Sequence, residues 1–160
     1  MKRRALLVLS SLSIVTTASS ITGCGGSGGS ENTQSNEETT TAVLALQSSH
    51  RSTYAADAQA LNRQLAAQGY LGSGNQLIAI ANLFIQYVQQ FLSAAQQYAA
   101  TRSPGDRTAI RAALAGLEAD DKTFGNNQLT NLGVLTGAQL TTYLAAFDLR
   151  IDSAYASAGI

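Results

Sequence analysis

The stretch between Arg63 and Arg102 contains no charged residue. Its uncharged polar residues from Asn82 to Gln97 fall within an arc of about 120° when plotted at 100° per residue. Large apolar residues, Ile80, Phe84 and Phe91 among them, gather on the opposite side. A two-sided pattern with this period is typical of an amphipathic helix and not of a β-strand. We therefore expect a helix over residues 75–101.

Helical periodicity begins ahead of this stretch. Ser35 and Glu38 have the spacing of a capping box, which predicts a first helix from about residue 36 to residue 68. Three glycines in residues 69–75 then end the helix and turn the chain. The expected apolar stripe of the first helix consists of Val43, Leu46, His50, Tyr54, Ala58, Leu61 and Leu65.

Two further helices follow. Ser103 and Asp106 form a second capping-box pattern around a proline that suits a first helical position, so we expect a third helix from residue 104 to about residue 122. The segment "TFGNNQLTNLG" after it is expected to be irregular. Thr136 is the expected N-cap of a fourth helix. Nothing strand-like appears, and short connections favour an antiparallel four-helix bundle over residues 39–160.

The low content of charged residues limits the kinds of molecule that the protein is expected to bind. Charged residues make up only 12% of the chain, about half the usual share. Formal net charge is zero, but from Cys24 onward there are seven basic and ten acidic residues, which gives −3. The chain therefore has no basic patch for nucleic acid and no polybasic surface for anionic lipid.

Residues 1–23 have the organisation of a secretory signal. The charged "MKRR" precedes a short apolar run that is too weak to remain in a bilayer as a span. The sequence "ITGC" at residues 21–24 follows, and it resembles the lipobox of bacterial lipoproteins. The resemblance implies that Cys24 receives a diacylglyceryl group, becomes the mature N-terminus, and anchors the protein to a membrane of the cell envelope. Gly25 after it favours the outer membrane, if the organism has two.

The residues after Cys24 suit an anchored protein. Glycine, serine and other small polar residues dominate residues 24–38, which we expect to be a flexible tether behind the lipid anchor. Acyl chains contribute about 0.8 kcal/mol per buried CH₂, so two or three of them would give stable attachment. Cys24 is the only cysteine, and its lipidation leaves none for a disulfide, a thiolate metal site or a nucleophile.

The residues for bundle-type metal or haem sites are scarce. The expected domain contains one histidine, His50, and one glutamate beyond its first helical turn, Glu118, while the only methionine is Met1. Di-iron sites of four-helix bundles need paired Glu-x-x-His motifs, so we expect no metal and no cofactor. The acidic "EADD" of residues 118–121 fails the EF-hand spacing, and we interpret it as a solvated helix end.

His50 is the only side chain that ordinarily titrates near neutral pH. Asp57 follows two turns later on nearly the same face, but about 10 Å of helix separates the two residues. We expect a partly buried histidine that bonds a backbone carbonyl or a tyrosine. An enzyme centred on His50 stays an alternative.

The expected function is a non-enzymatic structural or protein-interaction role, with another envelope protein or a second copy as partner. A solvent-facing helix normally carries Lys and Glu, so an uncharged polar face is a candidate contact surface. We name this surface the glutamine face, and it consists of Asn82, Gln86, Gln89, Gln90, Ser93 and Gln97. Two alternatives remain open: an apolar small-ligand or lipid carrier with a groove opened by "FGNNQLTNLG", and membrane association of the helix over 75–101.

Overall fold

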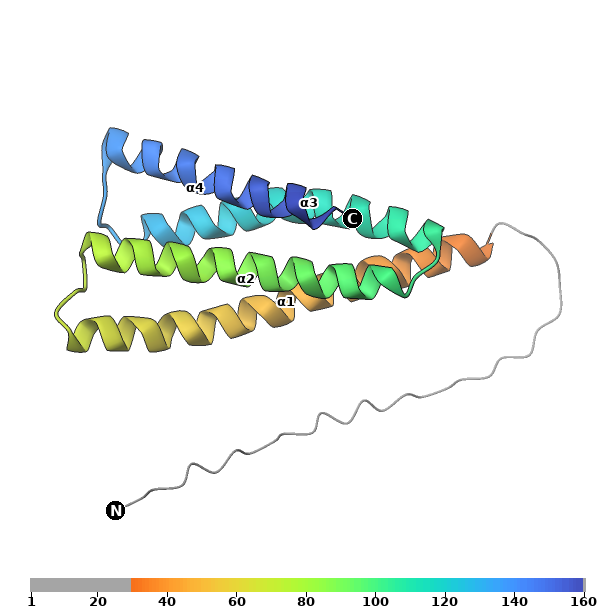
Figure 1. The fold of residues 1–160 in the computed structure, drawn as a ribbon, viewed down its shortest axis with the longest axis horizontal. Coiled ribbons are helices and arrows are strands. Elements are labelled where there is room, and N and C mark those ends of the chain that lie inside the picture. Colours follow the sequence, from red (N-terminus) through yellow and green to blue (C-terminus); the bar gives the residue numbers. More distant parts are fainter. Residues whose placement is uncertain (1–29, 160) are drawn as a thin grey trace, which may run out of the picture.

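In this computed structural model the chain forms four helices, and the structure describes residues 30–159 (Figure 1). The predicted signal peptide and Cys24 lie outside that range. The helices are α1 (Ser30–Ala67), α2 (Gly74–Ala100), α3 (Pro104–Thr130) and α4 (Gly137–Ala158), and the described residues contain no strand. Consecutive helices run in opposite directions, which confirms the predicted all-α antiparallel four-helix bundle.

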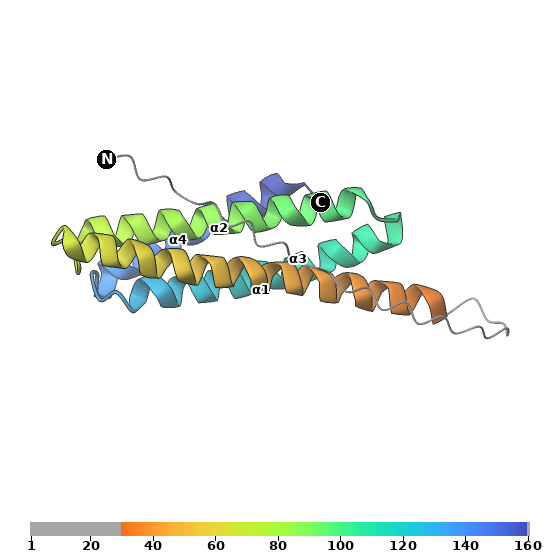
Figure 2. The same cartoon turned by 90° about the horizontal axis from the view of Figure 1, so that it is seen from below.

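The helices are arranged around the bundle so that α1 and α4 share the same two neighbours. α1 packs against α2 and α3, and α4 packs against the same two helices, while α1 and α4 do not touch within the described residues. α2 and α3 also meet across the centre, so α2 contacts all three other helices (Figure 2). α2 therefore lies between α1 and α4 on one broad side of the bundle.

α1 begins earlier than expected. It starts at Ser30, so residues 30–38 of the predicted tether are helical, and Ser35 lies inside the helix instead of capping it. The Ser35 hydroxyl donates to Asp106 Oδ1 at 2.7 Å, and the Thr39 hydroxyl donates to the same oxygen at 3.3 Å. The Ser35 contact joins α1 to α3 across 71 positions of the chain, so no local pattern reveals it.

α2 agrees with the prediction to within one residue at each end. The Ser73 hydroxyl accepts from the Gln76 backbone N–H at its start. α2 is also the one described helix that is long and apolar enough to cross a membrane, although half of its most apolar window is buried inside the bundle. Its apolar side forms the centre of the core with Phe84, Val88 and Phe91, all of them nearly inaccessible to solvent.

α3 starts as predicted but continues past its predicted end. Ser103 and Asp106 form the expected reciprocal capping box. The helix does not stop near residue 122: most of "TFGNNQLTNLG" is helical, and only residues 131–136 are irregular. Gly125 lies inside the helix and does not end it. A Cβ at this position would lie 2.8 Å from the Phe147 ring and 2.9 Å from the Phe84 ring. The absence of a side chain at Gly125 therefore lets α3 approach the aromatic core closely. The segment "FGNNQLTNLG", which was expected to open a carrier groove, is mostly helical.

α4 closes the bundle. Thr136 stands at the predicted N-cap, but its side chain makes no capping hydrogen bond. Phe147 and Ile151 are buried, and Gly159 ends the helix in the left-handed conformation with φ of 57°. Leu149 is 67% exposed on the outer side of the helix.

Candidate functional site

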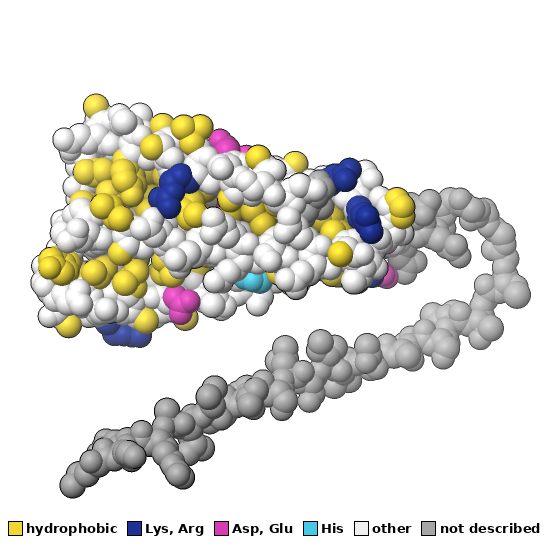
Figure 3. All heavy atoms as spheres, viewed as in Figure 1, with side chains coloured by type: hydrophobic (Ala, Val, Ile, Leu, Met, Phe, Trp, Pro, Cys, Tyr) yellow, Lys and Arg dark blue, Asp and Glu magenta, His cyan; other side chains and the backbone are white. Residues whose placement is uncertain are grey.

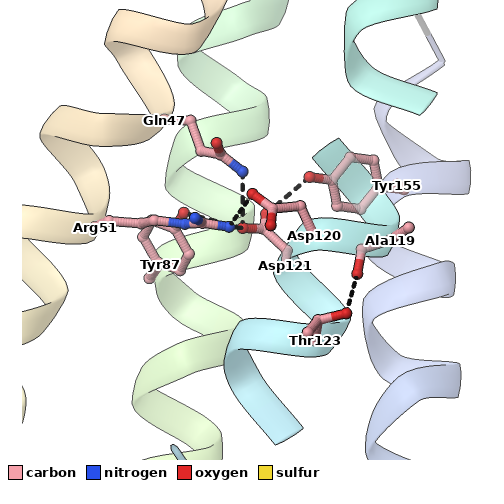
Figure 4. A network of polar contacts seen from close by, with 8 residues as sticks. All are labelled: Gln47, Arg51, Tyr87, Ala119, Asp120, Asp121, Thr123 and Tyr155. Carbon is pink, nitrogen blue, oxygen red and sulfur yellow. Dashed lines mark hydrogen bonds and ion pairs between the residues drawn. The ribbon is translucent and has the colours of Figure 1, made fainter. Parts of the chain in front are cut away.

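A buried carboxylate connects all four helices. Asp121 of α3 has no exposed surface, and its Oδ1 accepts from the Gln47 amide at 2.9 Å, the Arg51 guanidinium at 2.8 Å and the Tyr87 hydroxyl at 3.2 Å. Its Oδ2 accepts from the Tyr155 hydroxyl at 2.8 Å. Gln47 and Arg51 come from α1, Tyr87 from α2 and Tyr155 from α4 (Figure 4). We call these five residues the Asp121 network.

Arg51 neutralises the carboxylate from the edge of the core. Its guanidinium also donates to Asp120 Oδ2 at 2.8 Å and lies 4.8 Å from the centroid of the Phe124 ring. Burial by itself would lower the pKa of Arg51, but the hydrogen bond to Asp121 and the negative charge of that carboxylate outweigh burial and raise it. Arg51 therefore stays protonated, and its positive charge compensates the buried negative charge of Asp121.

The two tyrosines of the network act as donors. Burial raises the pKa of Tyr155, and the nearby negative charge of Asp121 raises it further. The same two causes, in the same order, raise the pKa of Tyr87. Both hydroxyls therefore keep their protons at physiological pH and can donate to Asp121. Because the carboxylate is inaccessible and its oxygens already accept four hydrogen bonds, the arrangement is suited to holding the helices in register.

The acidic cluster is divided among three environments and is not one solvated helix end. Asp121 points into the core, Asp120 is exposed beside Arg51, and Glu118 pairs with Lys122 at 3.1 Å. Lys122 also pairs with Asp152 of α4. These acids lie in the middle of α3, so they do not oppose a helix C-terminus. Among the residues that the structure describes, no three potential metal ligands converge.

His50 has the environment of a packed core histidine. It is half-buried, its Nδ1 lies 2.9 Å from the Leu46 carbonyl oxygen, and its ring meets the Phe91 ring edge-on with centroids 6.2 Å apart. This confirms the expected bond to a backbone carbonyl. Asp57 is exposed, and no hydrogen bond joins it to His50 in the described part of the chain.

The glutamine face lies on the broad side of the bundle, and all six of its residues are exposed. Asn82 accepts from the Arg150 guanidinium of α4 at 2.9 Å. Figure 3 views this side: dark-blue basic side chains lie along it, and magenta acidic side chains appear at its upper edge and in its lower part. The predicted face is therefore brought beside α4, which adds a cation that α2 itself lacks.

A groove of about 430 Å³ runs between α2 and α4 next to the glutamine face. Its polar lining includes Gln89 and Ser93 of that face, with Gln96 on the same helix. Gln96 donates to the Ala158 carbonyl oxygen near the end of α4. We call this hollow the α2–α4 groove, and its full lining is Ile85, Gln89, Leu92, Ser93, Gln96, Arg150, Ser153, Ala154, Ser157 and Ala158.

Comparison with protein-family models, with curated proteins and with solved structures gives no match for the chain.

Proposed function

We propose that this chain is a lipid-anchored lipoprotein of the bacterial cell envelope, without enzymatic activity, that binds another envelope protein or a second copy through the glutamine face and the α2–α4 groove. The observation that carries the proposal is the surface itself. It is continuous over two helices, exposed, and lined by amides and hydroxyls around a single cation. Amides and hydroxyls can hydrogen-bond a partner without the cost of desolvating charges.

Cys24 supplies the anchor in this proposal. The "ITGC" lipobox supports it, and α1 begins at Ser30, six residues after Cys24. A chain of that length spans at most about 20 Å. The end of the bundle where α1 begins would therefore lie nearest the membrane, and α2 and α4 would extend away from it.

Metabolic labelling with a palmitate analogue tests the anchor. We expect the protein to incorporate the label and to fractionate with membranes, and we expect Cys24→Ser to lose both properties. Labelling that persists in Cys24→Ser, or a native protein that is never labelled, would refute the anchor.

A triple substitution tests the contact surface. Gln86→Glu, Gln90→Glu and Gln97→Glu together place three negative charges on the glutamine face, and we expect association to be lost while the circular dichroism spectrum is unchanged. The matched control changes three exposed glutamines at the far end of α1 and just after it, Gln59, Gln64 and Gln68, to glutamate. Equal loss of association in both triple variants would remove the support for a specific face.

A further inference from the structure

We infer that the α2–α4 groove binds an acidic, extended segment of a partner protein. The inference rests on the proposed function and specifies its occupant. It follows from three properties of the groove, which are its lining, its charge and its length.

The lining of the groove matches an extended polypeptide. Ile85, Leu92 and Ala158 are buried and form an apolar floor. The rims carry amide and hydroxyl groups from Gln89 and Ser93 on α2 and from serines on α4. An extended peptide has free backbone N–H and C=O groups, and these side chains can both donate to and accept from them.

The charge of the groove is positive. Arg150 is the only charged residue in its lining. A second hollow of about 250 Å³ shares Gln96 and Ala158 with the groove and adds Arg107 and Arg111. No carboxylate lines either hollow, and none of the three arginines forms an ion pair within the described residues. Arg111 also lines an adjoining hollow, whose lining includes Glu118 and Asp152.

The hydrogen bonds of these arginines leave their charge unbalanced. Arg150 donates to the neutral Asn82 amide oxygen, and Arg107 donates to the Arg102 and Ala100 carbonyl oxygens at the end of α2. Cations without a carboxylate partner favour an occupant of the opposite charge, and electrostatic complementarity of this kind determines which partner is accepted.

The length of the two hollows sets the size of the occupant. They extend along α2 from Ile85 to Ala100, which is about 24 Å at 1.5 Å per residue. An extended chain rises about 3.3 Å per residue, so a segment of roughly seven residues fills this length. Acidic side chains along that segment would reach Arg150 near its one end and Arg111 and Arg107 towards its other end.

Other occupants fit the surface less well. A bilayer is flat on this scale and cannot enter a groove between two helices. A single-stranded nucleic acid needs aromatic side chains for stacking, and no aromatic residue lines either hollow. Residues 24–29 contain no acid, so they do not supply the segment.

The test uses the full mature chain with Cys24→Ser and a fluorescein-labelled peptide of alternating glutamate and alanine. We expect saturable binding in fluorescence anisotropy that weakens as salt is added. Arg150→Glu and Arg111→Glu should each weaken binding about tenfold. Arg63→Glu is the matched control, because Arg63 is exposed on α1 away from the groove, and it should bind like the parent chain. Thermal unfolding followed by circular dichroism establishes that each variant is folded.

Three results would overturn the inference. The first is no binding of the acidic peptide, and the second is equal weakening by Arg63→Glu and Arg150→Glu. The third is self-association of the purified chain that Arg150→Glu abolishes, because the occupant would then be a second copy. If Arg150→Glu and Arg111→Glu leave association in cells intact while the triple glutamate variant abolishes it, the acidic segment is refuted and the proposed contact surface stands.

Discussion

The Arg51 guanidinium of α1 and the Asp121 carboxylate of α3 meet at 2.8 Å, in a core where Asp121 has no contact with solvent. Removing one partner of such a pair leaves the other charge buried and uncompensated, which typically costs several kcal/mol. Because Gln47, Tyr87 and Tyr155 also bond this carboxylate, its loss affects all four helices at once.

We therefore predict that Asp121→Asn lowers the free energy of unfolding by about 3 to 5 kcal/mol. The matched control is Asp120→Asn, which removes the exposed partner of the same arginine and should cost less than about 1 kcal/mol. Urea denaturation followed by circular dichroism measures both. Equal losses in the two variants would show that the Asp121 network contributes no more than a surface ion pair.

Two tyrosines of the core should respond differently to loss of their hydroxyl. Tyr155→Phe removes a donor to a carboxylate and should cost about 1.5 to 3 kcal/mol. The Tyr54 hydroxyl is buried without a hydrogen-bond partner in the described structure, and burial raises its pKa to about 12. Tyr54→Phe should therefore leave stability unchanged or increase it slightly. A large loss from Tyr54→Phe in the same denaturation experiment would reveal an ordered water or another partner.

Two glycines of α3 provide a test of core packing. Gly125→Ala places a methyl group against the Phe84 and Phe147 rings and should cost about 1 to 3 kcal/mol. A methyl group at Gly116 would meet no neighbouring atom within 4 Å, so Gly116→Ala should raise stability by up to about 1 kcal/mol through helix propensity alone. The midpoint of thermal unfolding gives both signs. Stabilisation by Gly125→Ala would contradict the close approach of α3 to the aromatic core.

The start of α3 should be sensitive to acid. Hydrogen bonds from Ser35 and then Ser103 lower the pKa of Asp106 below its ordinary value of 3.8. Because the folded-state pKa is depressed, the stabilisation is present above pH 3.8 and is lost as the pH falls through the lower, folded-state pKa. NMR titration should show the pKa of Asp106 rising in Ser35→Ala and unchanged in the exposed control Ser48→Ala. No rise in Ser35→Ala would contradict the bond between α1 and α3.

Signals between neighbouring residues predicted much of the fold. The capping box of Ser103 and Asp106 and the apolar spacing of α2 both involve residues within a few turns of each other, and both predictions are confirmed. Two other predictions are wrong because they depend on residues far apart in the chain: that the helix ends before Gly125, and that Asp121 belongs to a solvated helix end. A glycine suggests a helix end and a cluster of acids suggests a solvated surface, but partners on other helices determine the roles of both residues.

For the candidate sites too, features within one helix were predicted and features formed between helices were not. Helical spacing was sufficient to identify the glutamine face on α2, and all six residues are exposed. The α2–α4 groove could not be predicted, because it depends on which helix lies beside α2. Arg51 and Asp121 are both visible in the sequence as charged residues, but no spacing along the chain indicates that they meet.

Site-specific photo-crosslinking in cells tests the central claim most directly. A photoreactive amino acid in place of Gln89 would lie at the rim of the α2–α4 groove, and one in place of Gln64 would lie on the exposed side of α1. We predict one discrete crosslinked species from Gln89, none from Gln64, and loss of the species when Cys24→Ser removes the anchor. Two results would contradict binding of an envelope partner at the α2–α4 groove: crosslinks of equal yield from both positions, and a Gln89 crosslink that remains unchanged in Cys24→Ser.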